Sequence, residues 1–566
     1  RCEGKVLALT FSNKAAEEIA ERVKDQISDN HVNRVEVGTI HSFCLDVVTN
    51  KGNQIGLPSG LAVIESSKDK LELLKRSCDS LKLVPKEQDL RLYLSQIQKY
   101  KQNFISPELA RKDERSIDII NLYETYNNLL IANRLLDFDD ILFYAYRILV
   151  ERPRVAKNYT RLYKYILIDE AQDLNETQYK ILQSLTRDFY NLMMVGDSAQ
   201  SIYGFNGSDS SIMTEKFIND YEPKEFVLTE NFRSTFKIID AANRIQSSSE
   251  SKSVYPLEGK VEVRSFEDEK QEATWIANQI QQLLKNGSPW VEGDIILEDI
   301  AVIGRNRYLF DHLEKAFQQQ EINYSFGGAN TYLECETQEM RVFEAGLRVL
   351  VNPYDELNYR EVNSILFREN QSDDYLNDLL ENRNINNEEL NREILNSIID
   401  AWLVLEQNEE NFAKVLNEIK NVVLSLGDLD ENFQFLIQND IELWKDRWNK
   451  YCQESVPGNR SLSYFRNQVS LGKFSVNSNE GVSLLTVHAS KGLEYEIVFI
   501  LGLTQGTFPD YRVKTPMQKK EEKNNMFVAI TRAKRECYLT YPLLKVMPWG
   551  STKVQKASEF LHIIDC

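Results

Sequence analysis

Two short segments carry acidic and amide side chains that suit phosphoryl transfer. The first, YILIDEAQDLN at 165–175, is an apolar run that leads into Asp169 and Glu170. The second, VGDSAQSIYGF at 195–205, follows another apolar run and contains Gln200. At the carboxyl edge of a parallel sheet, such carboxylates can hold Mg²⁺ and polarise an attacking water. A solvated strand end followed by a turn is the alternative, and neither segment alone excludes it.

The second segment also places aromatic residues beside the amide. Tyr203 and Phe205 follow Gln200 within five residues. Aromatic faces stack on any nucleic-acid base, so this loop suits a γ-phosphate sensor joined to a base-stacking platform. A turn with two buried aromatic side chains is the alternative for this segment.

The elements that must position these residues alternate between strands and helices. Two long stretches, 66–150 and 365–470, are helical and charged without a strand signal, and residues 14–28 also have helical spacing. Alternation interrupted twice by helical blocks predicts two α/β domains, each with a helical insertion. Apolar runs predict strands at 5–11, 35–39, 165–169, 191–196, near 226–228, and at 261–263, 300–303, 482–487, 497–501 and 537–540.

Composition narrows the class of protein. At about 150 residues per domain, 566 residues predict three to four domains. The chain has 67 Lys and Arg against 86 Asp and Glu, which gives a net charge of −19. This overall charge repels nucleic acid, so we expect any nucleic-acid path to be a local groove. Seven scattered cysteines favour a reducing cytosol over a disulfide framework or zinc cluster. No apolar run approaches the roughly 18 residues of a membrane span, so we expect a cytoplasmic protein without a membrane partner.

Eight sequence blocks occur in the order and approximate spacing of the UvrD/Rep/PcrA-type superfamily 1 DNA helicases, which the chain resembles. The blocks are LTFSNKAAEEIAERV (9–23), GTIHSFC (38–44), LLDFDDIL (135–142), ILIDEAQD (166–173), VGDSAQSIYGF (195–205), LTENFRST (228–235), LLTVHASKGLEYEIVFILGL (484–503) and FVAITRAK (527–534).

The resemblance implies an α/β fold with two RecA-like parallel-sheet motor domains, each carrying an all-helical insertion. The first motor domain would span 1–65 and 155–225, with its insertion at 66–154. The second would span 226–360 and 476–566, with its insertion at 361–475.

The resemblance also implies roles in a nucleotide site for ATP and Mg²⁺. Asp169 would hold the metal and Glu170 would be the catalytic base. Gln172 and Gln200 would orient the γ-phosphate and the water. The remaining roles fall to the second motor domain: Arg233 and Arg532 on the phosphates, Phe232 stacked on adenine, and Glu494 on the ribose.

A single-stranded DNA path is implied by the remaining blocks. Phe11, Asn13 and His41 would line it on the first motor domain, with Tyr203 and Phe205 as a stacking pair. For His41 and Phe11, a place in the core is the alternative reading. On the second motor domain the strand would contact Thr486, His488, Ser490 and Lys491.

Three departures from the family pattern stand out. The phosphate-binding loop G-x-x-x-x-G-K-[ST] is absent, and the first Met is Met193, so we expect the loop upstream of Arg1 or on a partner chain. Asn206 stands where the family usually has Arg, and 520–527 lacks part of an arginine pair. Without a phosphate-binding loop the chain alone should not hydrolyse ATP.

The resemblance implies an ATP-dependent DNA helicase, expected to translocate 3′→5′ on single-stranded DNA and to unwind duplex DNA in repair, recombination or defence against foreign DNA. A nuclease or another protein subunit is a candidate partner. The alternative is a non-catalytic DNA-binding or scaffold subunit of a helicase–nuclease complex. The chain retains all six residues that a decayed site would be expected to lose in part, which favours the enzyme: Asp169, Glu170, Gln200, Arg233, Glu494 and Arg532.

Overall fold

The chain folds into two compact units in the computed structural model. Unit 1 comprises Arg1–Ile166, Glu176–Leu192 and Asn330–Val476, and unit 2 comprises Leu167–Asn175, Met193–Ala329 and Asn477–Cys566. The structure describes residues 4–27, 29–112, 117–186, 191–204, 207–247, 251–327, 335–366, 377, 380, 390–427, 429–455, 460–474, 481–546 and 552–565.

Unit 1 contains the strand that leads to the first acidic segment. The sheet has the strand order β2-β1-β5-β6, made of β1 (Lys5–Thr10), β2 (Val35–Thr39), β5 (Tyr163–Ile168) and β6 (Leu192–Met194). β1 and β2 are parallel, with Val6 opposite Val35. The chain passes into unit 2 after Ile166, within β5, and again after Leu192, the first residue of β6. The strands predicted at 5–11, 35–39, 165–169 and 191–196 are confirmed within a few residues.

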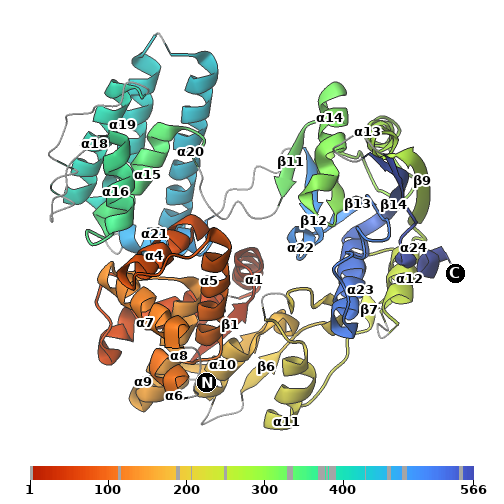
Figure 1. The fold of residues 1–566 in the computed structure, drawn as a ribbon. Helices are drawn as coiled ribbons and strands as arrows, with labels where there is room; N and C mark the ends of the chain where they lie inside the picture. The colour runs from red at the N-terminus through yellow and green to blue at the C-terminus, as the bar shows by residue number, and fades with distance from the viewer. Residues whose placement is uncertain are drawn as a thin grey trace. The chain divides into compact units, whose positions relative to one another are not determined.

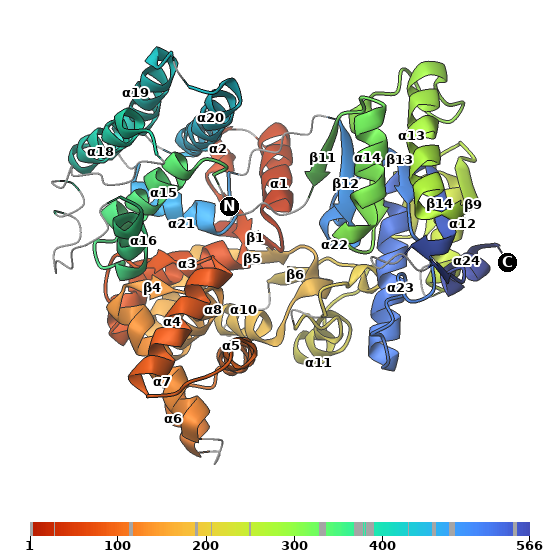
Figure 2. The same cartoon turned by 45° about the horizontal axis from the view of Figure 1, so that its top comes forward.

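Two groups of helices complete unit 1 (Figures 1 and 2). The first, which packs around the buried Leu73 and Tyr123, includes α4 (Ser67–Ser80), α5 (Glu87–Gln102) and α7 (Ile117–Ala132). The second, around the buried Trp402 and Trp444, includes α15 (Gln338–Val351), α16 (Glu356–Leu366), α18 (Arg392–Gln407), α19 (Phe412–Ser425), α20 (Glu431–Glu454) and α21 (Leu462–Ser470). Both predicted helical stretches are therefore confirmed in outline.

The first helical stretch is not free of strands, which corrects the sequence-based expectation. β4 (Leu135–Leu136) pairs in parallel with β3 (Ala62–Val63). A two-residue strand leaves no periodic pattern in sequence, because the period-two alternation needs several residues to become visible. Among the described helices of the chain, none combines the length and apolarity needed to cross a bilayer.

Unit 2 is built on a seven-stranded sheet in which β10 (Ile300–Gly304) is central. Its order is β11-β12-β10-β13-β14-β15, and β9 also pairs with β14. All these pairs are parallel except β14–β15. The other members are β9 (Lys260–Asp268), β11 (Tyr324–Gly327), β12 (Val482–Thr486), β13 (Tyr495–Ile500), β14 (Ala533–Val546) and β15 (Thr552–Val554). The predicted α/β class with parallel sheets is confirmed.

Helices cover both faces of this sheet (Figure 1). Val498 and Ile500 of β13 belong to a core that includes α12 (Phe236–Ile245), α23 (Pro516–Thr531) and α24 (Glu559–Asp565). Ile497 and Phe499 belong to the opposite core, with α13 (Glu269–Asn286) and α14 (Asp311–Gln319). Side chains alternate between faces along a strand, so a sheet covered on both sides needs an unbroken apolar run. This explains why these strands are visible in the sequence.

The strand predicted near 226–228 does not form. The side chains of Phe226, Val227 and Leu228 are 75%, 79% and 89% exposed, and the nearest strand, β7 (Glu230–Asn231), begins two residues later. β7 pairs with β8 (Lys252–Ser253). A strand requires a hydrogen-bonding neighbour as well as strand-forming residues, and propensity alone does not supply one.

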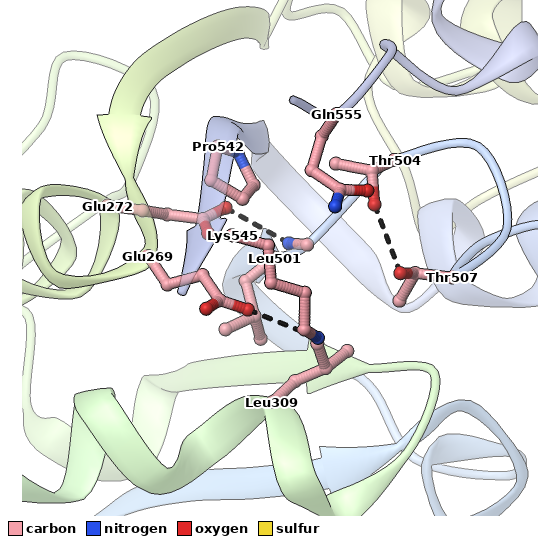
Figure 3. A pocket seen from close by; sticks show the side chains of 10 residues that line it. Glu269, Glu272, Leu309, Leu501, Thr504, Thr507, Pro542, Lys545 and Gln555 are labelled. Carbon is pink, nitrogen blue, oxygen red and sulfur yellow. Dashed lines mark hydrogen bonds and ion pairs between the residues drawn. The ribbon is translucent and has the colours of Figure 1, made fainter. Parts of the chain in front are cut away.

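A small pocket lies between the start of α13 and the loop after β13 (Figure 3). The buried carboxylate of Glu272 accepts hydrogen bonds from the Gly502 amide at 3.0 Å and the Thr540 hydroxyl at 2.6 Å. Lys545 forms an ion pair with Glu269 at 3.3 Å. Burial raises the pKa of Glu272 to about 7, although the two hydrogen bonds oppose this shift.

Glu272 should make the stability of unit 2 depend on pH. Its pKa in the folded state lies above the unfolded value of 4.5, so the folded state binds the extra proton between these two pH values. Stability should therefore fall as pH rises from 4.5 to about 7, by on the order of 3 kcal/mol. Glu272→Gln should remove this fall. Thermal unfolding midpoints at pH 5 and pH 8 test the prediction, with the exposed Glu258→Gln as control; an unchanged pH dependence in Glu272→Gln would contradict it.

Candidate active site

The first acidic segment leaves β5 with an unusual backbone conformation. Glu170 has φ 52° and ψ 39°, a left-handed conformation that non-glycine residues seldom adopt. The backbone carbonyl of Glu170 accepts a hydrogen bond from the Asp173 amide at 3.0 Å, and the Ala171 amide donates to Val195 at 2.9 Å. The surrounding hydrogen bonds thus hold Glu170 in a conformation of the kind that concentrates at functional sites.

Two amide side chains connect this segment to the loop after β6. Gln172 donates to the Glu170 carboxylate at 2.6 Å and accepts from the Asp197 amide at 2.9 Å. Gln200 donates to the Asp197 carboxylate at 3.0 Å. Gly196 permits this close approach, because a Cβ there would lie 2.4 Å from Oε1 of Gln172. Glu170, Gln172 and Gln200 therefore belong to one connected polar cluster.

Arg532 reaches this cluster from the end of α23. Its side chain is buried, and its guanidinium donates to the carbonyls of Val528 and Leu493, both at 3.0 Å, and to the Gln200 side chain at 3.5 Å. Burial, followed by the positive charge of Arg233, lowers the pKa of Arg532 to about 10. The guanidinium is therefore still charged at neutral pH.

Arg233 and Glu494 meet directly. They form an ion pair, and Glu494 also pairs with Lys534 at 3.1 Å. Burial opposes ionisation of Glu494, but the two cations lower its pKa overall. The neighbouring Phe232 is 70% exposed, which leaves its ring available for stacking. Arg233, Glu494 and Phe232 thus offer a cation, a carboxylate and an aromatic face, which suit the phosphates, ribose and base of a nucleotide.

The segment predicted to hold DNA in unit 2 makes mainly internal contacts. Thr486 caps α22 (Val487–Ser490), and the buried Ser490 hydroxyl donates to Val487 at 2.8 Å. Burial lowers the pKa of His488 to about 4, so the imidazole is neutral at pH 7. Tyr203 donates to the His488 carbonyl at 3.2 Å. Lys491 contacts the acidic segment, as argued below.

The other predicted DNA ligands lie in unit 1, apart from Phe205, which falls outside the described residues, as does Asn206. Asn13 donates to the Leu471 carbonyl at 2.7 Å. His41 lies edge-on to Phe138 with ring centroids 6.1 Å apart, and burial lowers its pKa to about 4. Phe11 is partly exposed between β1 and α1 (Asn13–Gln26).

The acidic segment suits a magnesium ion held jointly with a nucleotide. Asp169 is a partly exposed carboxylate directly after β5, and the described residues contain no group of three or more metal-binding side chains. Mg²⁺ usually binds through one or two carboxylates plus substrate phosphates, without a complete protein cage. The donor set at Asp169 therefore fits this mode of binding.

The structure also identifies polar residues that have no role in the sequence-based prediction of the site. Asp173 is buried and pairs with Lys491; burial raises its pKa to about 6, although Lys491 opposes the shift, so the carboxylate is ionised at pH 7.5. The Asn524 amide donates to the carbonyls of Ser198 and Ser201 and so fixes the loop before Tyr203. Asp173 lies within the acidic block, but nothing in the sequence indicates its partner.

Comparison with known protein families identifies the chain as a helicase of the UvrD/REP type. The sequence model of the UvrD/REP helicase N-terminal domain matches residues 2–222, and that of the UvrD-like helicase C-terminal domain matches residues 226–383 and 367–543. The matches cover most of the chain, which therefore belongs to the UvrD/REP helicase family. The sequence-based assignment to this family is confirmed.

Similar proteins carry corresponding names. The chain is 26% identical over 601 residues to a probable DNA helicase II homolog of Mycoplasma capricolum, covering 99% of the chain and 81% of that protein. It is 26% identical over 593 residues to the ATP-dependent DNA helicase PcrA of Staphylococcus epidermidis, covering 99% of the chain and 80% of that protein. The PcrA of Staphylococcus aureus is 27% identical over 594 residues, with the same coverage of each chain.

Proposed function

We propose that the protein is an ATP-dependent DNA helicase that translocates 3′→5′ on single-stranded DNA. The hydrogen bonds of 2.6 to 3.5 Å that connect Glu170, Gln172, Gln200 and Arg532 in unit 2 carry the proposed ATP hydrolysis. The polarity is what the resemblance to the family implies. Phosphoryl transfer depends on positioning and electrostatic stabilisation, so it needs a base, water-orienting amides and a guanidinium close together. Membership of the family and the names of the relatives support the same activity.

In this proposal different residues of the chain act as base, charge stabiliser, metal ligand and nucleotide ligands. Glu170 accepts a proton from the attacking water, and Gln172 fixes the carboxylate of Glu170. Arg532 neutralises charge that develops on the transferred phosphoryl group. Asp169 would hold Mg²⁺, which when bound supplies positive charge to the phosphate oxygens. Arg233 and Glu494 would hold the nucleotide, with Phe232 against the adenine.

DNA would follow a local path, because the net charge of −19 opposes binding through overall electrostatics. Phe11, Asn13 and His41 would contribute in unit 1. In unit 2 the contributing residues would be Tyr203, Phe205, Thr486, His488 and Ser490. Aromatic stacking with small polar donors suits single strands of any sequence. For Lys491 we argue a different role below.

We also propose the four-part organisation into two motor domains with helical insertions at 66–154 and 361–475. The separate helical cores around Tyr123 and Trp402 support two helical parts, although the second core already includes α15, which precedes the proposed boundary at 361. Cytoplasmic action in repair, recombination or defence against foreign DNA, with a nuclease or other protein subunit as partner, belongs to the same proposal.

Assays on the full-length protein test the activity and its polarity. We expect single-stranded DNA to stimulate ATP hydrolysis, and a duplex with a 3′ tail to be unwound faster than one with a 5′ tail. A non-hydrolysable ATP analogue should support neither stepping nor unwinding. A preference for the 5′ tail would contradict the polarity. DNA binding without hydrolysis would contradict the enzyme and favour the non-catalytic subunit.

A further inference from the structure

Lys491 does not occupy the position expected of a DNA ligand. It follows α22, and its side chain is only 6% exposed. The ammonium group pairs with the buried Asp173 carboxylate and donates to the Gln200 carbonyl at 2.6 Å. It also lies 3.5 Å from the Glu170 carboxylate. All these residues belong to unit 2.

The donors of Lys491 are already used inside the protein. A lysine ammonium has three N–H donors and no acceptor. Three protein oxygens, one each from Glu170, Asp173 and Gln200, lie within reach of the ammonium nitrogen. A DNA phosphate would have to displace one of them, and it would have to reach a side chain that is almost fully covered.

The partners of Lys491 belong to the proposed hydrolytic site. Glu170 is the proposed base, and the backbone of Gln200 carries the amide that contacts Arg532. Asp173 anchors the arrangement: its amide donates to the Glu170 carbonyl, and its own carbonyl accepts from the Ser208 hydroxyl at 2.6 Å. The second carboxylate oxygen of Asp173, Oδ1, is buried and has no hydrogen-bond partner among the described residues. The Asp173 carboxylate therefore depends strongly on the Lys491 charge.

The same lysine also contacts the proposed stacking aromatic. Its ammonium lies 5.3 Å from the centre of the Tyr203 ring. The Tyr203 hydroxyl donates to the carbonyl of His488, three residues before Lys491. Lys491 therefore connects the acidic segment, the Gln200 loop and the aromatic through one charged group.

We propose that Lys491 is a positioning residue for ATP hydrolysis and not a ligand of DNA. This inference rests on the proposed ATPase function. The ammonium holds the Glu170 carboxylate and the Gln200 loop at a fixed separation, while Asp173 fixes the ammonium. Without that cation, the carboxylates of Glu170 and Asp173 would repel each other, and Glu170 would leave its orientation toward the attacking water.

The proposal predicts that a change at Lys491 lowers the turnover of ATP without weakening the binding of ATP or DNA. In the full-length protein with saturating single-stranded DNA, Lys491→Met should lower kcat for ATP by about tenfold to a hundredfold, as loss of a positioning contact typically does. Two other constants should each change less than about twofold, because neither reports on the orientation of Glu170. They are the KM for ATP and the Kd for a fluorescein-labelled oligothymidine, measured by anisotropy without nucleotide. Lys491→Arg should recover most of the lost turnover, since it restores the cation.

A matched control and a double-variant cycle complete the test. Lys237→Met removes a lysine whose ion pair with Glu258 is exposed, and it should leave all three constants unchanged. Asp173→Asn should also lower kcat, and its effect should shrink in the Lys491→Met background because both changes break one contact. If Lys491→Met unfolds, the double-variant cycle is measured with Lys491→Arg and Asp173→Asn instead.

Two results would overturn the inference. The first is a weaker oligothymidine Kd in Lys491→Met, by tenfold or more, with kcat at saturating DNA unchanged. The second is an effect of Asp173→Asn that is independent of residue 491. If the unaltered protein hydrolyses no ATP, the proposed function fails as well, so the unaltered protein distinguishes the two failures.

Discussion

Replacing Glu170 by Gln is expected to lower ATP hydrolysis by at least about a hundredfold and to leave nucleotide binding intact. Gln has nearly the shape of Glu and can keep an oxygen as the acceptor for Gln172, but it cannot take a proton from water. Loss of a general base typically costs about a hundredfold to ten-thousandfold in turnover. We expect kcat to fall within this range and the Kd of a fluorescent ATP analogue to stay within about twofold of the unaltered value.

The left-handed backbone at Glu170 calls for a matched control. Glu222 has φ 45° and ψ 54°, lies in the same unit and is exposed. Glu222→Gln therefore makes the same chemical change in the same backbone conformation, outside the site, and should leave kcat unchanged. Turnover in Glu170→Gln equal to that of the unaltered protein would show that Glu170 is not the base.

Replacing Arg532 by Ala should lower turnover by about a thousandfold. A guanidinium that neutralises charge on a transferred phosphoryl group typically contributes a factor of this size or more. Arg532 keeps its charge at neutral pH, with a pKa of about 10, and it contacts Gln200 in the polar cluster. Steady-state hydrolysis at saturating ATP and single-stranded DNA measures the effect.

Because Arg532 is buried, the test must distinguish a loss of catalysis from a loss of folding stability. Its guanidinium also donates to the carbonyls of Val528 and Leu493, so its removal takes a hydrogen bond from each, although the Val528 carbonyl keeps the one from the Thr531 hydroxyl. Arg532→Lys keeps the charge without the planar fork and should lie between the unaltered protein and Arg532→Ala. The exposed Arg512, which pairs with Asp510, provides the control Arg512→Ala. Equal turnover in Arg532→Ala and Arg512→Ala, with unchanged thermal midpoints, would remove Arg532 from the mechanism.

The family and most of the regular structure could be predicted from the residues. Strands such as β10 and β13 are continuous apolar runs because helices cover both faces of their sheet. The order of the blocks led to the helicase family, which the domain matches confirm. The assigned roles of individual site residues remain predictions until the variants are measured.

Local sequence patterns could not supply the partners of these residues. The apolar run at 226–228 reads as a strand, yet its side chains are exposed because no neighbouring strand pairs with it among the described residues. Glu272 looks like a surface residue in the first turn of a helix, and only packing against Gly502 and Thr540 buries it. In both cases the outcome depends on whether a distant part of the chain supplies a neighbour: Glu272 has such partners in Gly502 and Thr540, and the described residues supply no pairing strand for 226–228.

The sequence by itself determined the class of fold, the order of its elements and the chemical groups available for hydrolysis, because these depend on residues that are close together in the chain. Only the tertiary structure decided which group each side chain meets. Lys491 and Asp173 are 318 residues apart, and their ion pair exists because the segment after β5 and the end of α22 converge in unit 2. A lysine in a block that the sequence predicts to contact DNA is therefore a candidate for positioning the proposed base, since burial and neighbouring charge set the role of an ionisable group.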